Sequence, residues 1–171
     1  MSETTEFGFS YEYGVDINLG TVETPNWQPI RFISAVDPQV TPVTQDAATY
    51  DDLGAPNQVK LSESWTASFT VQQQRLANGS FLPEVEKLRA LAGPTAVGQG
   101  ATGHFRWYDK PAQGAPNPTE AYEGEASVQF NRQNTGNDQI GGWSVTLTGR
   151  GKRREIENPY EGSETEPEIE D

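Results

Sequence analysis

The sequence predicts a mainly β domain, a sandwich or barrel-like sheet with one flanking α-helix, on three observations. Long stretches alternate apolar and polar residues, which is the period of a strand because successive side chains point to opposite faces. Turns rich in Gly, Pro and Asn separate these stretches. A single segment, residues 83–91, has helical spacing and helix end signals. At 171 residues the chain suits one domain with one sizeable core.

The clearest strand covers residues 59–73, VKLSESWTASFTVQQ. Its apolar residues are at odd positions, which form one face of a strand and one parity of the sequence. The even positions, the opposite parity, hold Ser, Thr and Gln with Lys60 as the only charge. At about 3.3 Å per residue the stretch reaches roughly 45 Å, much longer than an ordinary strand. A solvated face of an ordinary sandwich and a face reserved for a partner both fit this polar parity.

The region before this strand is predicted to form two strands followed by a long loop. Residues 7–19 and 30–36 alternate well enough to form the first two strands. Residues 38–57 contain three prolines and no sustained period, so we expect a long inter-strand loop of the kind that is usually functional. The aromatic and aliphatic side chains at its centre, residues 50–53, give it the composition of an interface. A loop folded back over its own core is the alternative.

The region after the strand supplies the helix and three more strands. The helix, residues 83–91, starts on a proline with an acidic first turn, and Gly93 and Pro94 end it. We expect it to cover one end or edge of the sheet. Alternation then predicts strands at residues 104–109, 122–131 and 143–148, the last two paired as a hairpin.

Aromatic residues lie on the apolar parity of the predicted strands. Those that we predict in the core are Trp65, Phe69, Trp107, Phe130 and Trp143. The alternative use of four tryptophans and six tyrosines is the stacking platform of a carbohydrate-binding sandwich. The parity that the tryptophans share with aliphatic residues favours the core.

The net charge of −13 is concentrated at the C-terminus. Residues 155–171 hold eight acidic residues and no base, which leaves −5 for the rest. We divide the chain into a β domain, residues 1–158, and a disordered acidic tail, residues 159–171. An acidic surface repels phosphate, which argues against stable nucleic-acid binding. The one basic cluster, residues 150–154, runs directly into the acidic tail.

Targeting and catalytic signals are scarce. The chain has no cysteine, its N-terminus lacks the pattern of a signal peptide, and no window has the apolar length of a membrane span. The single histidine, His104, cannot form a multi-histidine metal site. Asp51-Asp52 and Glu123 with Glu125 are possible carboxylate pairs, but a chain this acidic offers such pairs by chance. We expect no enzyme activity, no metal and no cofactor.

Several short motifs, taken in order, resemble the major tail tube protein of long-tailed, siphovirus-type phages that infect actinobacteria. Each motif is weak by itself, and the resemblance rests on their order and spacing over nearly the whole chain before the acidic tail. The motifs are Trp27-Gln28-Pro29-Ile30, Tyr50-Asp51-Asp52-Leu53-Gly54, Ser64-Trp65-Thr66-Ala67-Ser68-Phe69, Arg106-Trp107-Tyr108-Asp109, Tyr122-Glu123-Gly124-Glu125-Ala126, Leu147-Thr148-Gly149-Arg150-Gly151 and Asn158-Pro159.

The resemblance implies a structural virion protein with a tail tube fold. Hexameric rings would stack into a tube that encloses a tape measure protein, meets tail terminator and distal tail proteins at its ends, and conducts the genome. The chain would act in the virion after assembly in the host cytoplasm. The long loop would reach the adjacent ring through Tyr50, Asp51, Asp52 and Leu53. The runner-up is a monomeric carbohydrate-binding or adhesion module.

A conduit for DNA should offer phosphate no counter-charge, so that DNA is present in transit and is not held. Polar parity alone selects the residues expected to face such a lumen. They are Ser62, Ser64, Thr66, Ser68, Glu123, Glu125, Thr146 and Thr148. The alternative is that this parity faces outward to solvent.

Overall fold

A computed structural model describes residues 3–162, so most of the predicted acidic tail, residues 159–171, lies outside the described residues. The strands in chain order are β1 (Tyr13–Asn18), β2 (Trp27–Pro29), β3 (Ile33–Asp46), β4 (Gln58–Gln72), β5 (Thr102–Asp109), β6 (Ala121–Gln133), β7 (Gly142–Gly149) and β8 (Arg154–Glu155). One α-helix, α1 (Pro83–Leu91), and two short 3₁₀ helices, η1 (Tyr50–Asp52) and η2 (Gly98–Ala101), complete the described part.

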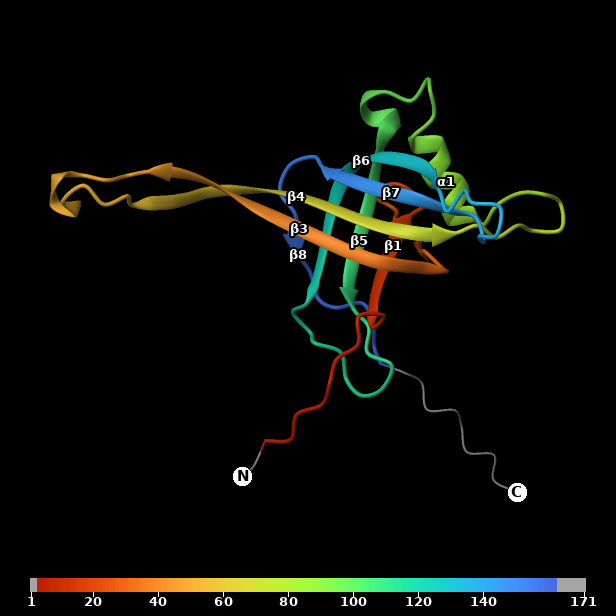
Figure 1. The fold of residues 1–171 in the computed structure, drawn as a ribbon, viewed down its shortest axis with the longest axis horizontal. Helices are drawn as coiled ribbons and strands as arrows, with labels where there is room; N and C mark the ends of the chain where they lie inside the picture. The colour runs from red at the N-terminus through yellow and green to blue at the C-terminus, as the bar shows by residue number, and fades with distance from the viewer. Residues whose placement is uncertain (1–2, 163–171) are drawn as a thin grey trace.

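The strands form one antiparallel sheet that curls into a half-barrel (Figure 1). Their order is β2-β1-β5-β6-β7-β4-β3, and β8 pairs with β6 beyond the end of β7. This confirms the predicted mainly β class with one flanking helix. Among the described residues, no helix has the length and apolar character needed to cross a membrane.

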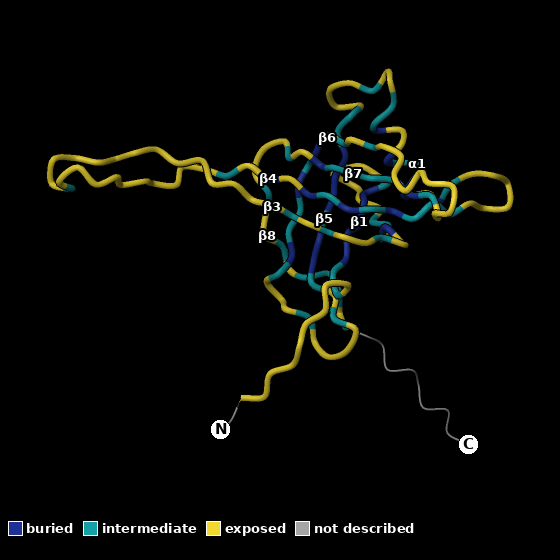
Figure 2. Tube along the Cα trace, in the orientation of Figure 1, coloured by how far each residue is buried: buried dark blue, intermediate teal, exposed yellow. Residues whose placement is uncertain are grey.

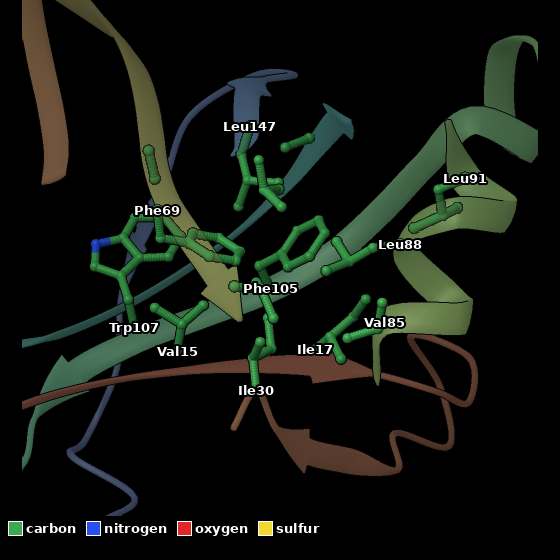
Figure 3. Packing of buried hydrophobic residues seen from close by; sticks show 14 of the residues in the cluster. Val15, Ile17, Ile30, Phe69, Val85, Leu88, Leu91, Phe105, Trp107 and Leu147 are labelled. Carbon is green, nitrogen blue, oxygen red and sulfur yellow. The ribbon is translucent and has the colours of Figure 1, made fainter. Parts of the chain in front are cut away.

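The core lies between one face of the curled sheet and α1 (Figure 3). Phe105 of β5 and Ile17 of β1 are fully buried and meet Val85 and Leu88 of the helix. Of the five aromatics predicted for the core, Trp65, Phe69 and Trp107 are buried, while Phe130 and Trp143 are half-buried and pack against the cluster.

The helix has the bounds that its end signals predict, and an ion pair between a half-exposed arginine and a buried glutamate fixes it to the sheet. Pro83 stands at the first helical position, where a missing N–H costs nothing. Glu84 is fully buried and accepts hydrogen bonds from Arg31 at 2.9 and 3.3 Å. Because Arg31 lies between β2 and β3, this pair holds the start of β3 against the helix. Sequence reasoning did not identify it, since the two residues are 53 positions apart.

The first predicted strand is shorter than expected, and the second begins later than expected. Only Tyr13–Asn18 of residues 7–19 is strand, and residues 30–36 contain the break between β2 and β3. Phe32, in this break, has φ of 60°, and Ala35, with φ of 54°, lies inside β3 at the register shift between Ser34 and Asp37. Alternation alone does not reveal such a break.

The predicted long loop, residues 38–57, is wrong in its first half. β3 continues to Asp46 and pairs with β4 along its whole length, so only residues 47–57 connect the two strands. Pro38 and Pro42 suggested a loop, but β3 is the last strand of the sheet. A proline is tolerated there because its missing N–H faces away from the neighbouring strand.

The outer halves of β3 and β4 leave the body of the sheet as a long hairpin, residues 41–64, which we call the arm. β7 pairs with β4 only from Thr66 to Gln72, so the arm has no third strand. In Figures 1 and 2 it extends far to the left, and almost every residue along it is exposed. A two-stranded hairpin buries little, so its apolar side chains remain in water unless another molecule covers them.

Candidate functional site

The end of the arm, residues 46–57, is an acidic tip whose turn is closed by its own hydrogen bonds and whose apolar residues are exposed. η1 is closed by a capping box, in which Asp52 accepts a hydrogen bond from the Thr49 N–H at 2.8 Å. Asp46 accepts from the N–H groups of Ala48 and Asn57. Two of the three aspartates therefore shape the turn, and Asp51 is left for other contacts.

Tyr50 and Leu53 are the most exposed apolar side chains of the tip, at 99% and 92%. Leu53 also has φ of 52°, a conformation that costs an ordinary residue about 1 kcal/mol or more and that glycine adopts freely. An aliphatic residue fixed in this conformation and fully in water indicates a contact surface. Of the four residues predicted to reach a neighbour, Tyr50, Asp51 and Leu53 are available, whereas Asp52 serves the turn.

The shaft of the arm exposes apolar residues on both faces. Val59 and Leu61 of β4 are 44% and 62% exposed. Val43 of β3 is opposite Ser62 and so lies on the other face. At the base, Glu63 bonds Arg153 at 2.8 Å and Lys60 at 3.1 Å, and these partners lower the pKa of the Glu63 carboxyl. The arm is thus anchored at its base and uncovered along its length.

The face of the sheet opposite the core carries rows of uncharged polar side chains. Residues paired across strands lie on the same face, so the register defines the rows. The rows across β3, β4, β7 and β6 are Gln39-Thr66-Thr148-Ser127, Asp37-Ser68-Thr146-Gln129 and Ser34-Thr70-Ser144-Asn131. Asp37 is the one formal charge in these rows. The predicted lumen residues Ser64, Thr66, Ser68, Thr146 and Thr148 lie on this face, and Ser62 continues it onto the arm.

Glu123 and Glu125 lie on the same face of β6, further along the strand, beside β5. Glu123 is engaged by Arg154 at 2.8 Å and lies 3.4 Å from the Nε2 atom of His104. The register brings Glu125 opposite His104. The two glutamates are therefore at the margin of the polar rows, and the charge of Glu123 is already balanced.

Three of the four basic residues in the cluster 150–154 contact other side chains of the sheet and its loops. Arg153 pairs with Glu63 and lies over the Tyr122 ring, and Arg154 pairs with Glu123. Arg150 donates to Gln99 and Thr102. These contacts reduce the positive charge that the cluster offers to phosphate.

The single histidine is held in one neutral form. The Asn18 carbonyl oxygen accepts from the N–H groups of Gly20 and Asn26, so its amide nitrogen faces Nδ1 of His104 at 3.1 Å. Nδ1 must then be the acceptor, and the ring proton lies on Nε2, toward Glu123. Burial, together with the charge of Arg154, lowers the His104 pKa, although Glu123 acts in the opposite direction. The role of His104 here is structural.

Several residues of the tail tube motifs stabilise this fold through packing or hydrogen bonds. A Cβ on Gly124 would lie 2.6 Å from the Trp65 ring, and one on Gly149 would also overlap that ring, so both glycines make room for it. The buried carboxylate of Asp16 accepts from Arg106 at 2.8 Å and from Tyr108 at 2.9 Å. Asp16 was missed because its partners are about 90 positions away along the chain.

The tryptophans do not form an open stacking platform. Trp65 and Trp107 are buried against each other, with ring centroids 4.7 Å apart. Trp27 lies between His104 and Arg106, and Trp143 packs between Phe81 and Phe130. The described residues contain no group of three or more acidic or histidine side chains positioned for a metal ion.

No protein-family model matches this chain, and no curated protein is significantly similar to it.

Proposed function

We propose that this chain is a structural subunit that polymerises as stacked rings into a phage tail tube. The observation that carries the proposal is the arm, which projects beyond the body with uncovered apolar side chains and a hydrogen-bonded tip. A monomer gains nothing from a long two-stranded hairpin of this kind. A copy in an adjacent ring would cover it.

The number of copies in a ring, six, comes from the motif resemblance. The polar rows span four neighbouring strands, β6-β7-β4-β3. Six such surfaces, at about 4.8 Å per strand and with the wider spacing of side-chain contacts between copies, give a circumference of at least about 115 Å and a backbone diameter of at least about 37 Å. This is wide enough for a DNA duplex.

The polar rows suit the wall of such a lumen. Ser, Thr, Asn and Gln side chains hydrogen-bond water and give phosphate no fixed counter-charge, so DNA would pass without being held. The tape measure protein would occupy the same space before ejection. Tail terminator and distal tail proteins would meet the rings at the two ends of the tube.

Assembly is assigned to the arm and to side-chain contacts, not to a continuous backbone ladder between copies. The two terminal strands of the sheet both carry prolines, Pro29 in β2 and Pro38 and Pro42 in β3. Prolines on edge strands remove outward N–H donors and limit uncontrolled edge pairing.

Negative-stain electron microscopy and sedimentation of the purified chain over a range of concentrations test this proposal. We expect rings or tubes at high concentration. Replacing residues 50–53 with Gly and Ser should shorten or abolish the tubes while the melting temperature stays within a few degrees. A chain that remains monomeric at every concentration would contradict the proposal.

A further inference from the structure

We infer that the tip of one copy docks on an arginine-rich aromatic corner of the next copy. This inference rests on the proposed function and adds the surface that receives the arm. The corner consists of Arg75, Phe81, Arg89, Phe130, Arg132 and Trp143, from the β4–α1 connection, the helix, and the β6–β7 hairpin.

The aromatic rings of the corner form a partly open, continuous surface. Trp143 lies 4.9 Å from Phe130 and 5.3 Å from Phe81, measured between ring centroids. All three residues are half-buried at the edge of the core, so part of each side chain remains accessible. Apolar side chains such as Tyr50 and Leu53 gain from contact with such a surface.

Three arginines surround these rings. The guanidinium carbons of Arg75 and Arg89 lie 5.3 and 5.2 Å from the Phe81 centroid, and Arg132 is the cross-strand neighbour of Trp143. Arg89 is paired with Glu86. In the part of the chain that the structure describes, Arg75 and Arg132 form no ion pair.

The charges of the corner and the tip are complementary. Residues 46–57 contain three aspartates and no basic residue. The corner gathers three arginines in a chain whose net charge is −13. Opposite potentials steer association and fix which surfaces meet. Two tips would repel each other, so the charge pattern favours contact between unlike surfaces.

The two surfaces lie at opposite ends of the molecule. In Figure 1 the tip is at the far left, and the connection after β4 and the β6–β7 hairpin are at the right. A contact between opposite ends is heterologous, so it repeats from copy to copy and builds an extended array wherever the rotation between copies does not close into a ring. Such an arrangement is what stacking requires.

The test mixes two full-length variants. The tip variant is Tyr50→Ser/Asp51→Ser/Leu53→Ser, and the corner variant is Arg75→Glu/Arg89→Glu. Each should raise the concentration needed for end-to-end assembly at least about tenfold, because one surface of every junction is lost. A mixture contains one intact tip and one intact corner, so it should form pairs, or paired rings, that grow no further in sedimentation velocity.

Lys110→Glu serves as the control, since it reverses an exposed charge away from the corner and should leave assembly unchanged. Thermal melting checks that each variant remains folded. If the wild-type chain assembles and the corner variant assembles equally well, or if the mixture does not pair, the docking inference is overturned while the proposed function stands. If the wild-type chain never assembles, the proposed function fails first.

Discussion

The two halves of β4 have the same sequence pattern and opposite surroundings. In the body, Trp65 and Phe69 are each 2% exposed. In the arm, Val59 and Leu61 continue the same parity and are 44% and 62% exposed. The difference is the neighbours: the body half lies between β3 and β7 and packs its apolar side on the core, whereas the arm half has only β3.

The two halves of β4 show which structural features the alternating pattern determines and which it does not. Alternation fixes the strand and the side on which each residue lies. It does not say which molecule covers the apolar side. In the body the same chain covers the apolar side, and in the arm we propose that another copy covers it.

Removing a buried aromatic ring from the body half of β4 should have the largest effect on the free energy of unfolding. Phe69→Ala should destabilise the chain by about 3–5 kcal/mol, because it removes a buried ring and leaves a cavity. Urea denaturation monitored by tryptophan fluorescence measures the loss. A loss below about 1 kcal/mol would mean that the body half is not packed as described.

A second test adds volume to the body. Gly124→Ala should cost about 1–3 kcal/mol, because the new methyl group overlaps the buried Trp65 ring. Ser127→Ala, on the exposed face of the same strand, is the matched control and should change little. Equal stability of the two variants would argue against the tight contact at Trp65.

A third test uses pH. The His104 pKa is lowered in the folded chain, so the unfolded chain binds a proton first as pH falls below about 6.5. Stability is therefore full above that pH and declines below it, by at most about 1.4 kcal/mol per pH unit. His104→Asn keeps an acceptor for Asn18 and should reduce this slope. An unchanged slope between pH 7 and 5 would assign the effect to other groups.

Shortening an exposed side chain in the arm half of β4 should have the smallest effect on the free energy of unfolding. Leu61→Ala in the arm should change the free energy of unfolding by about 0.5 kcal/mol or less, because its side chain is already in water. The same change should weaken assembly, as seen by light scattering. A large loss of stability in the dilute, monomeric chain would show that the arm is covered by its own subunit.

The sequence predicted the elements whose signals are local. The helix bounds follow from Pro83 and Gly93, and the alternating stretch identified β4 to within one residue at each end. β3 was missed because Pro38 and Pro42 mark a loop unless the strand is known to lie at an edge. Edge position depends on the pairing of distant segments, which no local pattern contains.

The composition of residues 50–53 indicated a contact surface at the tip, but the geometry of the tip could not be predicted from the sequence. The apolar and acidic character of residues 50–53 singled out the tip, but the division between Asp52, which serves the turn, and Asp51, which faces outward, needed the hydrogen bonds. The arginine corner was not predicted at all. Arg75 and Arg132 are far apart along the chain and meet only through Phe81 and Trp143.

Hydrogen–deuterium exchange of the full chain, compared between dilute and concentrated samples, shows whether another copy covers the arm. We expect backbone amides of the arm, residues 41–64, to exchange quickly in the dilute chain and to become protected on assembly, together with the loop that contains Arg75. Assembly that protects other segments while the arm stays open to exchange would contradict this expectation.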